Sequence, residues 1–260
     1  ILFVGYALFE VPSNVILARV GARRWIARIM ISWGLVAAAM MFVRTPLQFY
    51  VARFLLGATE AGFFPGMVYY LVHWFPARER ARALAGFMIA IPLSSVIGGP
   101  VSGALLGLDG RLGLAGWQWL FLLEGLPSAL VGVTVLWWLT DRPEEARWLT
   151  PAQRDWLVAR LRADGADAAP HHGAPHPAAA HDAPLAAFRR PDVWLLAVPY
   201  FLLGAIAYVF TFWAPTLFRD ALGWSPQTVG VATGVIGGLV ALVMLAVGRS
   251  ADRRGEHALH

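Results

Sequence analysis

The sequence has no cysteine and no lysine, and only 14% of its 260 residues are charged. Without cysteine, the chain can form neither disulfide bonds nor thiolate metal sites. All 21 basic residues are arginines that gather in short stretches between apolar runs, so the net charge of +5 does not indicate nucleic-acid binding. A nucleotide-binding loop, a His-Glu-x-x-His pair and a nucleophile elbow are also missing, so we expect neither an enzyme nor a cofactor.

Apolar residues predominate in the sequence: 58% of the residues are hydrophobic, and the mean hydropathy is +0.59. These values lie outside the range of soluble globular domains and indicate a membrane protein embedded in a lipid bilayer. A helix needs roughly 20 mostly apolar residues to cross hydrocarbon about 30 Å thick, and this length predicts an all-α protein. The seven predicted transmembrane helices cover residues 1–18, 25–43, 47–74, 82–106, 117–140, 192–218 and 226–247.

The density of arginine alternates from one connection to the next. Many arginines follow the first, third, fifth and last spans, whereas the opposite connections hold only Arg44, Arg111 and Arg219. The positive-inside rule places the arginine-rich connections in the cytoplasm. We therefore expect a multi-pass protein of a bacterial inner membrane, whose first span begins outside and whose last span ends inside.

The composition changes in residues 141–191, where charged residues, alanine, proline and histidine replace the apolar runs. We interpret this stretch as a cytoplasmic linker between two helical bundles. The N-terminal bundle covers residues 1–140, and residues 192–260 form the start of the C-terminal bundle.

Two parts of the linker are distinct. Thr150 and Gln153 have the spacing of a capping box, which predicts a short amphipathic helix that ends near Ala163. The low-complexity part that follows is predicted to be disordered, because its composition cannot build a core. Its histidines lack the fixed spacing of a metal site, and we interpret them as solvated; they are His171, His172, His176 and His181.

The third span carries Arg53 and Glu60 in a segment that otherwise belongs in lipid. Seven residues turn an α-helix by about 700°, so both side chains lie on one face, roughly 10 Å apart along the axis. A charge at the helix centre costs about 2.5–3.5 kcal/mol on insertion scales, so this face must look toward protein or water. One interpretation is structural ion pairs, for example with Glu10. The other is that Glu60 carries a proton and Arg53 attracts an anionic substrate.

Two segments that follow spans resemble a known loop. Residues 248–255, G-R-S-A-D-R-R-G, resemble the G-x-x-x-D-R-x-G loop of the major facilitator superfamily, and residues 18–24 resemble its first copy with alanine at the acidic position. These loops follow the second and the eighth helix of that superfamily. The resemblance implies a major facilitator type helical bundle, truncated to helices two to eight of twelve. It also implies cytoplasmic gating loops that contain Arg19, Gly21, Arg23, Gly248, Asp252 and Arg253.

Longer motifs narrow the resemblance to the anion:cation symporter family. The run R-x-x-L-G-x-x-E-A-x-x-F-P-G at residues 53–66 resembles the family's fourth helix. Residues 10–25 contain E-V-P-S-N and G-A-R-R-W and are similar to the family's second helix. Residues 116–127 contain G-W-Q-W-L-F and are similar to its sixth helix. Bacterial members import organic anions such as tartrate, phthalate and glucarate together with protons. The resemblance implies that Arg53 binds the substrate charge and Glu60 couples protons.

Three further side chains complete the predicted substrate site, namely Tyr6, Ser95 and Tyr208. Other roles stay open, such as an interfacial tyrosine for Tyr6 and packing against small residues for Ser95. The predicted function is import of a carboxylate-bearing organic anion with protons by alternating access, by a protein that is monomeric at full length. An efflux antiporter of the same fold is the alternative, because the cavity chemistry does not set direction. A transport-inactive membrane sensor is a second alternative function.

Overall fold

The computed structural model describes residues 1–167 and 191–254, and all regular structure in these residues is helical, which confirms the predicted all-α class. The α-helices are α1 (Leu2–Val20), α2 (Ala22–Ala39), α3 (Pro46–Glu60), α4 (Phe63–Trp74), α5 (Ala77–Met88), α6 (Ala90–Leu106), α7 (Gly116–Trp138), α8 (Pro151–Asp167), α10 (Pro191–Leu222) and α11 (Pro226–Arg254). Short 3-10 turns are η1 (Met40–Phe42), η2 (Arg111–Gly113) and η3 (Pro143–Glu145).

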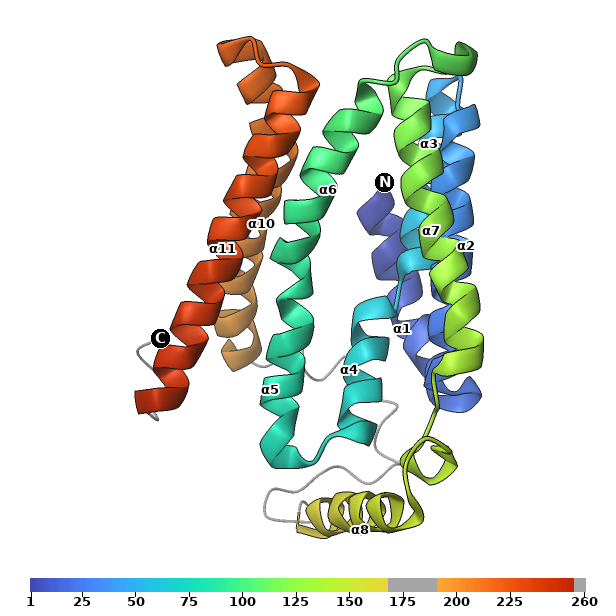
Figure 1. Ribbon diagram of the computed structural model, residues 1–260, viewed down its shortest axis with the longest axis vertical. Coiled ribbons are helices and arrows are strands. Elements are labelled where there is room, and N and C mark those ends of the chain that lie inside the picture. The colour runs from blue at the N-terminus through green and yellow to red at the C-terminus, as the bar shows by residue number, and fades with distance from the viewer. Residues whose placement is uncertain (168–190, 255–260) are drawn as a thin grey trace.

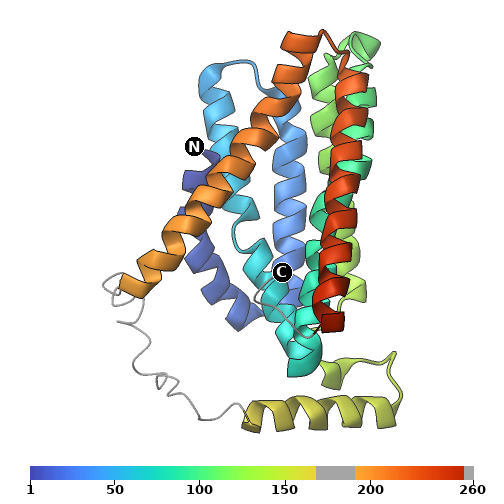
Figure 2. The same ribbon diagram turned by 90° about the vertical axis from the view of Figure 1, so that its left-hand side faces the viewer.

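The long helices run side by side in two groups (Figure 1). The first helix group consists of α1, α2, α3, α4 and α7, the second of α10 and α11, and α5 and α6 lie between them. α8 is different, because it lies across one end of the bundle at a steep angle to the other helices (Figure 2). We call this end the α8 end. It also holds the α1–α2 and α4–α5 connections, which are among those that the sequence predicts to be cytoplasmic.

Six stretches of the described residues are long and apolar enough to cross a membrane, and they correspond to six of the seven predicted spans. α5 and α6 together make one of them, since only Ile89 separates the two helices. The third predicted span differs, because it consists of α3 and α4 instead of one helix. The expectation of a continuous helix over residues 47–74 is therefore wrong, and the physical reason is the position of Pro65.

Small residues allow close approach between the packed helices. A Cβ added to Gly34 of α2 would lie 2.6 Å from the Gly125 carbonyl oxygen of α7. In the same way, a Cβ added to Gly99 of α6 would lie 2.5 Å from the Gly230 carbonyl oxygen of α11. Helix association in lipid depends on such van der Waals contact, because lipid tails are as apolar as the side chains. The α6–α11 contact therefore joins the intermediate helices to the second helix group.

The end of the last predicted span also differs from expectation. We predict a loop with tight turns from Gly248 onward, but α11 stays helical to Arg254. Gly248, Asp252 and Arg253 therefore lie on the helix, and their side chains fall outside the described part of the chain. The four linker histidines also lie outside the described residues.

The predicted capping box of the linker helix is confirmed. The Gln153 N–H donates to Thr150 Oγ1 at 3.3 Å, and the Thr150 N–H donates to Gln153 Oε1 at 3.0 Å. α8 starts at Pro151, as expected, and ends at Asp167 instead of near Ala163.

Candidate functional site

The break between α3 and α4 follows from the place of one proline. In a continuous helix the Ala61 carbonyl oxygen would accept a hydrogen bond from residue 65, but Pro65 has no N–H and its ring collides with that carbonyl. α3 therefore ends at Glu60, Gly62 takes a left-handed conformation with φ 86°, and α4 begins at Phe63. Glu60 is thus the last residue of a half-helix inside the third predicted span.

Ser13 of α1 satisfies the carbonyl oxygen that Pro65 leaves without a helix partner. The Ser13 hydroxyl donates to the Ala61 oxygen at 2.7 Å, and the indole N–H of Trp25 on α2 donates to Ser13 Oγ at 2.9 Å. Ser13 is only 5% exposed. A Cβ added to Gly62 would overlap the Ser13 hydroxyl, so this position needs glycine both for its φ and for its close approach.

α1 and α3 touch backbone to backbone one turn before the break. A Cβ added to Gly57 would overlap the Leu2 carbonyl oxygen and would lie 3.0 Å from the Tyr6 nitrogen. A Cβ added to Gly5 would likewise overlap backbone of α3. Because Tyr6 lies at this contact and Glu60 follows Gly57 by one helical turn, the crossing brings the two side chains into the same region.

Four side chains gather there, and we call them the tyrosine–glutamate cluster: Tyr6, Glu10, Glu60 and Tyr208. Tyr6 precedes Glu10 by one turn of α1, and it lies within electrostatic range of Glu10, Glu60 and Tyr208. Tyr208 reaches α1 from α10, and its ring meets the Phe3 ring edge to face with centroids 5.2 Å apart. The structure thus brings together three predicted site residues from helices that are distant in sequence, and adds Glu10 to them.

Arg53 has a different environment. It lines a hollow of about 560 Å³ at the end of the bundle opposite α8, together with Arg44 and Trp117. The Arg53 Nε is buried without a hydrogen-bond partner, and the guanidinium carbon lies 5.1 Å from the centre of the Phe49 ring. Among the described residues no ion pair joins Arg53 to Glu60 or to another carboxylate. The guanidinium therefore packs against Phe49 and has no carboxylate partner within the described part of the chain.

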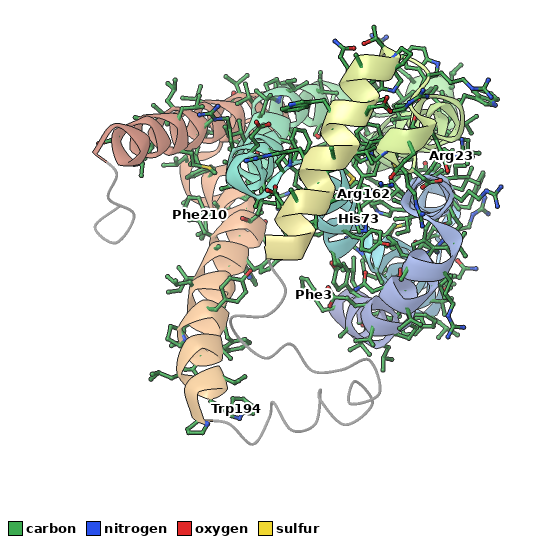
Figure 3. The ribbon with its side chains drawn as sticks, turned by 90° about the horizontal axis from the view of Figure 1, so that it is seen from below. Phe3, Arg23, His73, Arg162, Trp194 and Phe210 are labelled. Carbon is green, nitrogen blue, oxygen red and sulfur yellow. The ribbon has the colours of Figure 1, made fainter. Side chains whose placement is uncertain are left out.

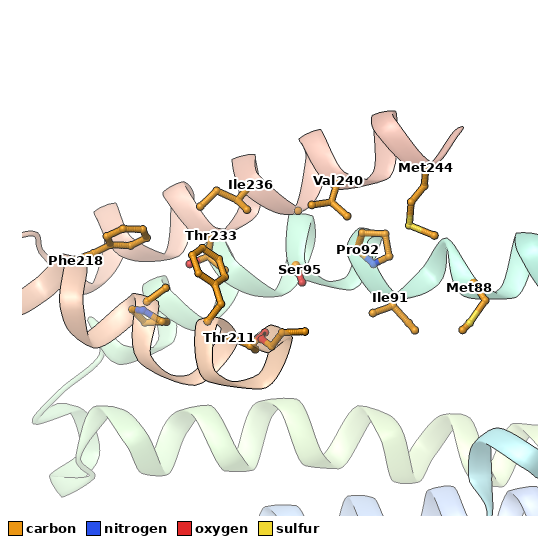
Figure 4. A pocket seen from close by; sticks show the side chains of 15 residues that line it. Met88, Ile91, Pro92, Ser95, Thr211, Phe218, Thr233, Ile236, Val240 and Met244 are labelled. Carbon is orange, nitrogen blue, oxygen red and sulfur yellow. Dashed lines mark hydrogen bonds between the residues drawn. The ribbon is translucent and has the colours of Figure 1, made fainter. Parts of the chain in front are cut away.

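Ser95 faces a second hollow, which lies between α5, α6, α10 and α11 and has a volume of about 600 Å³ (Figure 4). Its walls are apolar except for the hydroxyl groups of Ser95, Thr211 and Thr233. The Thr211 and Thr233 hydroxyls donate to carbonyl oxygens of their own helices. Ser95 also packs closely against Gly237 of α11, which fits the alternative role of packing against small residues.

The predicted gating residues of the first loop meet an acidic partner. Gly21 makes the tight turn between α1 and α2 with φ 93°. In the first turn of α2, the Arg23 N–H donates to Asp141 Oδ1 at 2.7 Å, and Arg23 Nε lies 3.8 Å from Asp141 Oδ2. Asp141 follows α7 in sequence and so caps α2 from another segment. Arg19, Gly21 and Asp141 border a hollow of about 220 Å³.

α8 is attached to the same end of the bundle. The N–H of Ala77, the first residue of α5, donates to Asp164 Oδ2 of α8 at 2.7 Å. The Trp148 ring, which precedes α8, stacks on Trp74 at the end of α4 with centroids 5.7 Å apart. Figure 3 looks onto this end and shows α8 crossing it. The linker helix therefore contacts the α4–α5 connection directly.

Sequence reasoning missed the role of Ser13 and the partnership of Asp141 with Arg23. Pro65 removes the helix donor of Ala61, but a proline alone does not reveal a break, because Pro12 and Pro127 lie inside continuous helices. No local signal identifies Ser13 or Asp141 as the partners. Within residues 1–167 and 191–254, no group of three or more His, Asp or Glu side chains is placed to hold a metal ion.

Similar sequences are known over the whole length of this chain. The family model described as Major Facilitator Superfamily matches residues 1–259. A candidate tartrate transporter of Agrobacterium vitis is 49% identical over 260 residues, which is 100% of this chain and 56% of that protein. The candidate metabolite transport protein NicT of Pseudomonas putida is 48% identical over 260 residues, which is 99% of this chain and 57% of that protein.

A solved structure has the same fold. It is a bacterial homologue of the human lysosomal transporter Spinster in an inward-facing, unoccupied conformation, with a TM-score of 0.67 and 18% sequence identity. The match covers 97% of this chain and 53% of that one. At this identity the likeness shows the fold alone. In all three comparisons, this chain spans somewhat more than half the length of the protein that it matches.

Proposed function

This chain belongs to the major facilitator superfamily, and from that membership we propose that it forms part of a secondary transporter that imports a carboxylate-bearing organic anion together with protons. The family and the two relatives at 48–49% identity are transporters, not enzymes. The relative described as a candidate tartrate transporter supports a small organic anion as substrate. Six membrane-length apolar stretches within the described residues support a multi-pass protein of the bacterial inner membrane.

The observation that carries the proposal is the tyrosine–glutamate cluster. An ionisable acid within a membrane segment costs about 2.5–3.5 kcal/mol on insertion scales, and such acids mark proton relays and ion pathways. Glu60 ends a half-helix, and the ends of discontinuous helices are where transporters bind substrates and coupling ions. We assign the proton to Glu60, and we assign binding of the substrate carboxylate to the hydroxyl groups of Tyr6 and Tyr208.

Arg53 supplies a positive charge on the same helix as Glu60, toward the end of the bundle opposite α8. Its hollow also contains Arg44, so two guanidinium groups border one opening at the end of the bundle opposite α8. Clefts lined by one sign of charge raise the local concentration of the opposite ion. We therefore assign to Arg53 the attraction of the substrate anion, and the absence of a carboxylate partner for Arg53 among the described residues supports this role.

The membrane potential explains why an importer of anions needs protons. At 100 mV, inside negative, the inward movement of one negative charge costs about 2.3 kcal/mol, which holds a monoanion near about 2% of its outside concentration. One proton for each negative charge removes this penalty. A side chain that gains and loses a proton at the substrate site is the simplest way to link the two fluxes.

The position of the cluster suits alternating access. Tyr6 and Glu60 belong to the first helix group and Tyr208 to the second, so movement of one group against the other would open the cluster to either side in turn. At the α8 end, Arg19, Gly21 and Arg23 lie where that side would open. We assign these three residues to the cytoplasmic gate.

Glu60→Gln in the complete gene product tests the coupling role. The substitution preserves the size of the side chain and removes its titratable proton, so proton-driven accumulation in proteoliposomes should be lost while anion exchange persists. Glu144→Gln, which changes an exposed acid at the α8 end, is the matched control and should accumulate normally. A thermal-shift screen of dicarboxylates, aldonates, aldarates and aromatic acids, beginning with tartrate, selects the probe anion. Full accumulation by Glu60→Gln would refute the coupling role.

Arg53→Gln tests the attraction of the anion. Charge of one sign in a cleft raises the local concentration of the opposite ion by about 10-fold to 1,000-fold, so the half-saturation concentration of the probe anion should rise by about tenfold or more. Arg147→Gln removes an exposed arginine elsewhere and should leave affinity unchanged. If Arg53→Gln binds the anion as the parent protein does, Arg53 has only a structural role beside Phe49.

The same cluster would also serve an efflux antiporter, which exchanges substrate for protons. Vesicles of opposite orientation, with the same pH gradient, separate the two functions. Accumulation of the anion on the side that receives protons supports import by symport. Accumulation on the side that supplies protons supports the antiporter instead.

A further inference from the structure

One hydroxyl group bridges the break between α3 and α4. Pro65 leaves the Ala61 carbonyl oxygen without a helix donor, and the Ser13 hydroxyl donates to it at 2.7 Å. A hydroxyl has a single proton, so Ser13 can then only accept from Trp25, and the 2.9 Å bond from the Trp25 N–H has this direction. The relay from Trp25 through Ser13 to Ala61 is therefore directional, and each of its hydrogen-bonding groups has a partner.

The face of α1 that carries Ser13 also carries part of the tyrosine–glutamate cluster. Tyr6, Glu10 and Ser13 have the spacing i, i+4 and i+7, so they lie on one face over about 10 Å of helix. This face contacts α3 at Gly57 and the break at Gly62. One rigid helix face thus determines where Tyr6 lies and where the residue after Glu60 lies.

We propose that Ser13 is a positioning residue for proton coupling, because its bond to Ala61 fixes the end of α3 and holds Glu60 within range of Tyr6. This inference rests on the proposed role of Glu60 as proton carrier. Without the bond, the Ala61 carbonyl would lack a partner in a medium without water, and the end of α3 would shift toward another donor. Gly62, with its left-handed φ, provides the freedom for that shift.

Three variants separate positioning from stability. Ser13→Ala leaves Ala61 without a donor. Adding Pro65→Ala to it restores an N–H at position 65, which can satisfy Ala61 by closing the helix but moves Glu60. Trp25→Phe removes a hydrogen bond of the same relay and leaves the bond from Ser13 to Ala61 in place, so it is the matched control.

The measurement is the pH profile of Glu60 modification by a carbodiimide, which reacts with protonated carboxyl groups, followed by mass spectrometry of the complete gene product. We expect Ser13→Ala and the double variant to move the midpoint of the profile by about one pH unit, a tenfold change in proton affinity. Trp25→Phe should lower the melting temperature and keep the parent midpoint. The double variant should regain the melting temperature that Ser13→Ala loses.

Two results would overturn the positioning role: a double variant with the parent midpoint, or a Trp25→Phe midpoint that moves as far as that of Ser13→Ala. A parent protein in which Glu60 reacts equally at every pH would instead refute the proposed proton carrier. The failure of the further inference and the failure of the proposed function are therefore distinguishable in one experiment.

Discussion

Replacing Gly57 with alanine tests the contact that brings Tyr6 to Glu60. The new Cβ would overlap the Leu2 carbonyl oxygen and would lie 3.0 Å from the Tyr6 nitrogen, and both neighbours are backbone atoms that cannot turn away. Forcing a methyl group into such a contact costs about 1–3 kcal/mol. Alanine also favours the helix over glycine by about 0.5–1 kcal/mol, so we expect a net loss of up to about 2.5 kcal/mol in the free energy of unfolding.

Gly86→Ala on α5 is the matched control, because no atom lies within 4 Å of the Cβ that it adds. This variant keeps the gain in helix propensity and avoids the overlap, so the two variants should differ by the packing cost of about 1–3 kcal/mol. At about 2–4 °C for each kcal/mol, the difference is several degrees in the melting temperature of the complete gene product in detergent. Equal melting temperatures would show that α1 and α3 separate freely and that this contact does not hold the cluster.

Two further predictions concern the α8 end. Asp141→Ala removes the cap on the Arg23 N–H and should lower stability by about 0.5–2 kcal/mol in thermal unfolding. High salt should reduce this contribution of Asp141 only in part, because the hydrogen bond remains when the ion pair is screened. An unchanged melting temperature would contradict the capping role. Asp164→Ala removes the hydrogen bond to the Ala77 N–H and should make limited proteolysis of the linker faster. The control Asp155→Ala changes an exposed position of the same helix and should leave the cleavage rate unchanged. Equal cleavage rates for the two variants would mean that the hydrogen bond does not hold α8 in place.

Local sequence is sufficient for much of this fold. A membrane helix satisfies its backbone hydrogen bonds within itself, so a window of apolar residues predicts it without knowledge of its neighbours. α7 and α11 accordingly begin within one residue of the predicted starts at residues 117 and 226. The Thr150 capping box is equally local, because both of its hydrogen bonds join residues three apart. The break after Glu60 does not belong to this category, because Pro12, Pro100 and Pro127 lie inside continuous helices, so a proline alone does not determine where a helix ends.

The candidate site was predictable only in part. Charge within an apolar span singles out Arg53 and Glu60 as residues that need protein or water around them, but a shared helix face does not give them a shared environment. The structure places Arg53 in the hollow opposite the α8 end and Glu60 within electrostatic range of Tyr6. The identity of those neighbours depends on how α1 and α10 cross α3.

The sequence by itself determined the class of protein, six of the seven spans and the start of the linker helix, because each depends on residues within a few turns of one another. The tertiary structure alone decided that Ser13 completes the hydrogen bonding of Ala61, that Asp141 caps α2, and that α10 brings Tyr208 to α1. These pairs are separated by 48 or more residues, and in lipid no difference in hydrophobicity selects one helix partner over another. The choice is made by the fit of small residues and buried polar groups, which exists only once the helices are packed.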